Sequence, residues 1–115
     1  MGAWGYGIYD NDGAMDAVID IEKNLEEYSN DYIKALIKYK EDYFANGVVT
    51  GSDNYAVLLA ADIEIKNTGT LKIFKDLTKE CLETELSKEV LSNWKEPEKR
   101  QEKLLDFKNI INKYL

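Results

Sequence analysis

The chain has 115 residues, of which 44% are hydrophobic and 32% charged, and its formal net charge is −7 at pH 7. This length predicts a single domain, residues 1–115, around one core. No apolar run approaches the roughly 18 residues of a membrane helix, and the N-terminus lacks the basic and apolar regions of a secretory signal. A lone cysteine, Cys81, excludes an internal disulfide. We therefore expect a cytoplasmic protein without membrane contact.

Acidic residues are concentrated at the N-terminal end. Residues 1–30 contain seven acids and one base, Lys23, whereas residues 31–115 contain fifteen acids and fourteen bases. Because such a surface repels phosphates, we expect no nucleic acid partner. It would attract a basic protein, since the field of an acidic face steers association. The alternative is that the charge serves only solubility.

Helical spacing of apolar residues is common in the chain, and only one proline is present, so we expect an all-α fold. The first expected helix covers residues 12–28, with Asp12 or Asn11 as its N-cap. Its acidic first turns suit the positive end of the helix dipole. The apolar face of this helix consists of Ala14, Val18, Ile21, Leu25 and Tyr28.

A second helix is expected over residues 30–45. Ser29 or Asn30 would cap its start, and Gly47 lies just past its end. The following residues, 47–54, contain Gly, Ser, Asp and Asn, which predict a loop.

Residues 54–69 predict a central, largely buried helix, because apolar residues surround it on nearly all sides. A short strand over residues 55–59 is the competing prediction. Ala60 and Ala61 and the length of the segment favour the helix, which Gly69 would end.

Three further helices complete the predicted fold. One covers residues 71–82, a break follows at 84–87, a short helix starts near Ser87, and Pro97 suits the first turn of the last helix. The buried stripe of this last helix would be Leu104, Phe107, Ile111 and Tyr114, broadened by Leu105, Ile110 and Leu115. The fold class is therefore all-α, a single compact bundle of five or six helices.

The opening MGAWGYGIYDNDGAMD combines four glycines with Trp4 and several aspartates. Glycines allow a close approach of the backbone, and a tryptophan supplies a large apolar surface. We expect a Gly/Trp-rich loop tucked on the core, with Trp4 as its plug. Asp10, Asn11 and Asp12 would then turn the chain into the first helix. The alternative is that the aspartates and backbone amides line a pocket near Trp4.

This opening resembles the start of the bacterial family catalogued as domain of unknown function 4259. Its members begin with Met-Gly-Ala-Trp-Gly, followed by an aromatic residue, an acid, Asn-Asp, and an Ala-x-Asp that enters a helix. The segments AVLLAAD and LTKECLETELSKEVLSNWKE and the last amphipathic helix are similar to later parts of the family, so the likeness spans essentially the whole chain. Gly13 departs from the pattern, since the family more often has a second acid there. The resemblance implies no activity.

Catalytic chemistry is sparse in this sequence. The chain has no histidine, which removes the usual general base and metal ligand. Cys81 lies on an apolar helix stripe and is expected in the core, and zinc would need several Cys or His ligands. We therefore expect no metal and no cofactor.

Asp62 follows the apolar run at residues 58–61. If it is buried, it needs a partner, because an unpaired buried carboxylate is costly. That partner would be a cation, an exposed helix end or the indole of Trp4. In the alternative, Asp62, Asp10 and Asp12 converge on a cation or on a substrate hydroxyl.

The favoured function is that of a small, acidic, non-enzymatic binding protein of the immunity, antitoxin or inhibitor type. It would present the first helix to a basic protein partner. The candidate contact residues are Asp16, Asp20, Glu22, Glu26 and Glu27.

Two alternatives remain open. A carboxylate-based domain or enzyme would bind a divalent cation or a small ligand through Asp10, Asp12 and Asp62, in a pocket that also includes Trp4 and Asn11. In the other alternative, the first two helices pair copies of the chain into a homo-oligomer.

Overall fold

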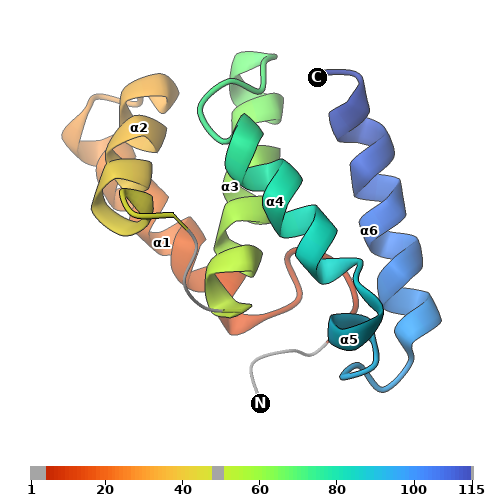
Figure 1. The fold of residues 1–115 in the computed structure, drawn as a ribbon. Coiled ribbons are helices and arrows are strands. Elements are labelled where there is room, and N and C mark those ends of the chain that lie inside the picture. Colours follow the sequence, from red (N-terminus) through yellow and green to blue (C-terminus); the bar gives the residue numbers. More distant parts are fainter. Residues whose placement is uncertain (1–4, 48–50, 115) are drawn as a thin grey trace.

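A computed structural model describes residues 5–47 and 51–114. Within these ranges the fold is all-α, as the sequence predicts, and it contains six helices and no strand. Figure 1 shows their arrangement in a compact bundle. The helices are α1 (Asp12–Glu27), α2 (Tyr32–Phe44), α3 (Gly51–Thr68), α4 (Lys75–Glu85), α5 (Lys88–Leu91) and α6 (Pro97–Asn112).

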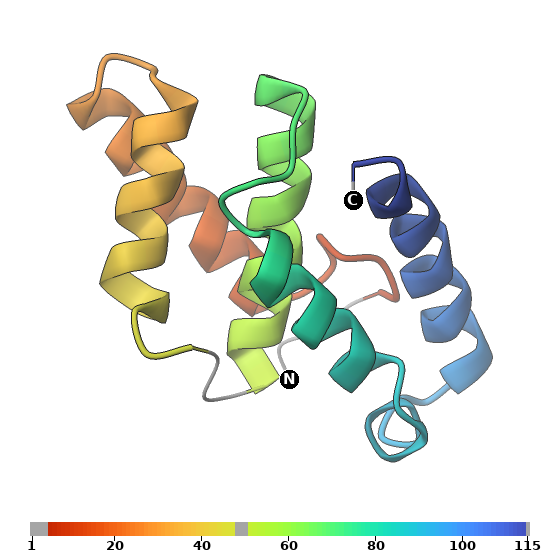
Figure 2. The same cartoon turned by 45° about the horizontal axis from the view of Figure 1, so that its top comes forward.

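Helix α3 is the centre of the molecule, and α1, α2 and α4 pack on it. Its residues from Val57 to Ala61 are fully buried, which agrees with the apolar residues around its whole circumference. Helix α6 lies at the edge of the bundle, beside α4 and α5 (Figures 1 and 2). The core therefore lies around α3, and α6 covers only one side of it.

The N-cap of α1 is Asn11, whose side chain accepts a hydrogen bond from the Ala14 amide at 2.7 Å. The N-cap of α2 is Asp31, so the prediction of Ser29 or Asn30 was wrong. Both of those residues have positive φ angles, 55° and 66°, and they form the turn itself. A cap needs a non-helical residue whose side chain reaches the first free amides, and Asp31 accepts from the Lys34 amide at 3.1 Å.

Helix α3 begins at Gly51, so the predicted loop at 47–54 ends earlier than expected. Gly47 does lie past the end of α2, with a φ of +86°. The polar residues that indicated a loop lie in the first turn of α3. The first turn of a helix favours polar and acidic side chains, because its amides have no partner within the helix and it lies at the positive end of the helix dipole. Asp53 lies in this turn.

Helix α4 begins at Lys75, four residues later than predicted. The buried Glu64 of α3 explains the delay. Its carboxylate accepts hydrogen bonds from the backbone amides of Lys72, Ile73 and Phe74, at 2.6, 2.9 and 3.0 Å. These hydrogen bonds keep residues 72–74 in a non-helical connector between α3 and α4. Leu71 is buried as part of this connector.

The chain breaks after α4 as predicted, and Ser87 caps the short helix α5. Pro97 occupies the first turn of α6, also as predicted. Tyr114 is 37% exposed, against the prediction that it is buried, because it lies beyond the end of α6. Leu105 and Ile110 are likewise exposed, since α6 is covered on one side only. Leu115 lies outside the described residues.

Candidate functional site

The N-terminal segment, residues 5–11, runs between α3 and α6 in both views of the fold (Figures 1 and 2). It forms a tight turn in which the Gly7 amide donates to the Asp10 carboxylate at 3.1 Å and the Asp10 amide donates to the Gly7 carbonyl at 3.2 Å. A Cβ atom added at Gly5 or Gly7 would lie 2.7 or 2.8 Å from Asp10 Oδ2. Both glycines are therefore needed for the close approach of this carboxylate.

Arg100 of α6 anchors this segment to the bundle. Its side chain is fully buried, and one terminal nitrogen donates to the carbonyls of Tyr6 and Gly7 at 3.0 and 3.3 Å. The other terminal nitrogen pairs with Glu85 of α4 at 3.2 Å. Its Nε has no hydrogen-bond partner among the described residues. A buried charge requires such compensation, so this contact fixes the position of α6.

Further groups surround Arg100 and complete what we call the Arg100 cluster: Arg100, Glu85, Asn54, Tyr55 and Trp94. Asn54 of α3 donates to the second oxygen of Glu85 at 3.1 Å. The guanidinium lies 4.5 Å from the centre of the Trp94 ring and 5.5 Å from that of Tyr55, within the range of cation–π attraction. The cluster therefore links α3, α4 and α6 at one buried point.

Tyr6 connects the N-terminal segment to the start of α6. Its hydroxyl donates to Glu96 at 2.9 Å, and its ring lies 6.0 Å from the Trp94 ring. This hydrogen bond lowers the pKa of Glu96 and raises the pKa of Tyr6. The contact is only partly buried, so we assign it a positioning effect on the segment rather than a large contribution to stability.

Asp62 of α3 is buried and has two partners. The Tyr9 hydroxyl donates to it, and the ammonium of Lys66 lies 2.8 Å from the same carboxylate oxygen. Burial and this hydrogen bond raise the pKa of Tyr9 above its ordinary value. Asp62 thus forms the salt bridge that its burial requires, and it fastens the N-terminal segment to α3.

The structure describes the residues of the predicted pocket except Trp4. Asp10 closes the turn at Gly7, Asn11 is buried at the start of α1, and Asp12 is exposed. Asp62 is engaged by Tyr9 and Lys66. Trp4 lies outside the described residues. Within residues 5–47 and 51–114, no group of three or more acidic or cysteine side chains could hold a metal ion.

The outer side of α1 carries the predicted partner-binding residues. Asp16, Glu22, Glu26 and Glu27 are exposed, and Asp20 is half-buried toward α2. Two large apolar side chains lie among them, Met15 at 40% and Ile19 at 49% exposure. We call Met15, Asp16, Ile19, Glu22, Glu26 and Glu27 the α1 face.

Asp20 differs from the other predicted contact residues because it lies against an aromatic side chain of α2. Burial first, and then this aspartate, raise the pKa of Tyr43. Asp20 therefore belongs to the junction of α1 and α2, at the margin of the α1 face.

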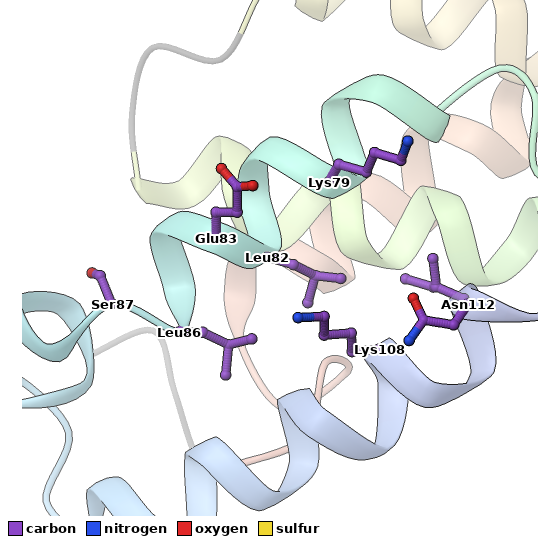
Figure 3. A pocket seen from close by; sticks show the side chains of 8 residues that line it. Lys79, Leu82, Glu83, Leu86, Ser87, Lys108 and Asn112 are labelled. Carbon is purple, nitrogen blue, oxygen red and sulfur yellow. The ribbon is translucent and has the colours of Figure 1, made fainter. Parts of the chain in front are cut away.

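A groove of about 300 Å³ lies between α4 and α6 (Figure 3). Its apolar lining consists of Leu82, Leu86 and Ile111, and its polar lining of Lys79, Glu83, Ser87, Lys108 and Asn112. A second hollow, of about 350 Å³, lies between α2 and the connector before α4, with Phe44 and Ile73 in its lining.

Sequence reasoning missed the Arg100 cluster, although a signal for it exists. Arg100 lies four residues before Leu104, on the same buried stripe of α6. Glu85 similarly lies one turn after Cys81 and Leu82 on the buried side of α4. When a basic residue and an acidic residue each lie on the apolar stripe of a helix, the pattern predicts a buried ion pair between them. Neither charge is normally buried without a partner.

These observations define a class of protein: an all-α bundle in which the N-terminal segment joins the central helix to the last one. Comparison with known families matches residues 2–106 to the model described as Domain of unknown function (DUF4259). The chain belongs to this family, as its opening motif indicated. The curated proteins and the solved structures contain no match. No helix among the described residues is long and apolar enough to cross a membrane.

Proposed function

We propose that the protein is a non-enzymatic binding protein that presents the α1 face to a basic protein partner. The observation that supports this proposal is the position of Met15 and Ile19. Both are large, apolar and exposed, and they lie on a helix surface where exposed acids surround them and Lys23 is the exposed base. The two side chains lie four residues apart, one turn along the same helix, so they form one continuous apolar spot rather than scattered single residues.

The arrangement of the α1 face has the anatomy of a binding surface. Helical spacing places Ile19 near its middle, with Met15 and Glu22 on one side and Asp16 and Glu27 on the other. Apolar anchors within a polar rim are typical of protein interfaces, where the anchors supply most of the binding energy. The acidic rim would accelerate encounter with a basic partner.

A small acidic helical protein with such a face is similar in type to immunity proteins, antitoxins and inhibitors, which act by occupying the surface of another protein. The likeness is one of general properties, and it makes a toxin or an enzyme of basic surface the expected partner. The absence of histidine from the sequence supports a binding role over a catalytic one.

The test reverses the charge of the α1 face. The variant E22K/E26K/E27K and the variant I19A are each compared with the unchanged chain in affinity purification from the host. We expect both to lose the captured partner, and we expect capture by the unchanged chain to weaken as salt rises.

A matched control carries E89K/E102K/D106K, which makes the same change in net charge at exposed positions of α5 and α6. It should retain the partner. The proposal is overturned if the α1 variants capture the same protein as the unchanged chain, or if the control loses it equally.

A further inference from the structure

We propose that the groove between α4 and α6 binds a small amphiphilic anion, a carboxylate with a medium-length apolar chain. This proposal goes beyond the function assigned to the α1 face, and the groove shares no residue with that face. The two surfaces are also apart in the fold, since α6 lies beside α4 and α5 and not beside α1.

Three apolar side chains line the groove beside the polar ones. Leu82 lies in α4 and Leu86 lies one turn later at its C-cap, and Ile111 of α6 lines the groove with them. Figure 3 shows Leu82 and Leu86 directed from α4 toward α6. An apolar chain placed here would be withdrawn from water, which contributes about 0.8 kcal/mol per fully buried methylene group.

The size of the groove favours a small ligand. A volume of about 300 Å³ lies at the low end of the range of small-molecule sites, roughly 300–1,000 Å³. It can hold an apolar chain of medium length, and it is too small to admit more than a few side chains of a partner helix.

The charges of the groove select the head group. Two lysines and one glutamate line it, so its balance is one positive charge. In Figure 3, Lys108 extends from α6 toward Leu82, with Asn112 beside it, whereas the Glu83 carboxylate is directed away from α6. Neither Lys79 nor Lys108 forms an ion pair within the described residues. One carboxylate is therefore the complementary head group, bound by the Lys108 ammonium and the Asn112 amide.

The test uses decanoate, below the concentration at which it forms micelles, with the full chain. Decanol and decyltrimethylammonium carry the same apolar chain with a neutral or a cationic head. We expect saturable binding of decanoate by calorimetry and weaker binding of both other compounds. Amide chemical shifts in NMR spectra should change at Leu82, Leu86 and Ile111 and not on α1.

Two substitutions distinguish binding at the groove from a general effect of the protein's charge. K108Q should weaken decanoate binding by about fivefold, since it removes the counter-charge of the head group. K103Q changes an exposed lysine of α6 outside the groove and should leave the affinity unchanged. Both positions are exposed, and circular dichroism checks that both variants fold.

Several results would overturn the proposal. They are a lack of saturable decanoate binding, equally tight binding of decanol or decyltrimethylammonium, equal affinities of K108Q and the unchanged chain, and shift changes located away from the groove.

Discussion

The charged side chain of Arg100 has no exposed surface. It binds backbone carbonyls of the N-terminal segment as well as the side chain of Glu85. Its two terminal nitrogens reach the N-terminal segment and α4 at once. An apolar residue in its place would fill space but could not satisfy the carbonyls of Tyr6 and Gly7. We infer that this residue is kept for the geometry it imposes, because a buried ion pair is by itself weak evidence of stabilisation.

Replacing Arg100 with Met should lower the free energy of unfolding by about 3–5 kcal/mol, because Glu85 would remain buried without its cation. Urea denaturation followed by circular dichroism measures the change. The double variant R100M/E85M should be more stable than R100M, because it removes the orphaned carboxylate. K103M, at an exposed position of α6 that forms no ion pair among the described residues, should stay within about 0.5 kcal/mol of the unchanged chain. A loss below about 1 kcal/mol in R100M would contradict the structural role of Arg100.

The N-terminal segment acts as an element of the fold although it has no regular secondary structure. Through Tyr9 it contacts α3, and through its carbonyls it contacts α6. Ile8 and Tyr9 also pack against the core. Since α6 otherwise lies only beside α4 and α5, the segment supplies a large part of the attachment of the last helix.

This role predicts a specific intolerance at Gly7. An alanine there would place its Cβ 2.8 Å from Asp10 Oδ2, so the carboxylate must move and lose its hydrogen bond from the Gly7 amide. We expect a loss of about 1 kcal/mol in the free energy of unfolding. In a D10A background the same substitution should be much less destabilising, because the clashing carboxylate is gone. A double-mutant cycle by urea denaturation measures this coupling. Equal losses in the two backgrounds would show that the Asp10 contact does not determine the effect.

The helices were predictable because their apolar spacing is regular. Periodic stripes located α1, α2 and α6, and the apolar residues around its whole circumference located α3. Ser87 and Pro97 marked the starts of α5 and α6. The late start of α4 was missed because a distant side chain decides the backbone there. Glu64 delays the start of α4 by binding three amides of the connector, and no local pattern shows this.

The candidate sites were less predictable than the fold. The acids of α1 could be identified from charge alone, but the exposure of Met15 and Ile19 depends on which side of α1 meets α3. The groove between α4 and α6 depends on how α6 is attached, through Arg100 and the N-terminal segment. The contacts of Arg100 with the Tyr6 and Gly7 carbonyls join residues more than ninety positions apart, beyond the reach of spacing arguments.

At the scale of the whole molecule, burial of proton-bearing groups limits stability at high pH. Burial raises the pKa of Tyr39, which is 3% exposed, and that of Tyr9. It also raises the pKa of the Cys81 thiol to about 12. In the unfolded chain these groups titrate near 10 for tyrosine and 9 for cysteine. The folded state thus retains protons that the unfolded state releases, and the net charge of −7 grows as other groups ionise.

The sign of the pH dependence follows from this difference. Because the folded pKa values are raised, their contribution is complete below the unfolded values and is lost as pH rises toward the folded ones. We expect stability to decline from about pH 9, where Cys81 ionises in the unfolded chain, and more steeply above about pH 10, by up to about 1.4 kcal/mol per pH unit for each buried group. Urea denaturation at a series of alkaline pH values measures the decline. Y39F should reduce the slope above pH 10, whereas Y114F, at an exposed position, should leave it unchanged. A slope that is the same in Y39F and the unchanged chain would show that repulsion among surface charges, rather than burial of the phenol, causes the alkaline unfolding.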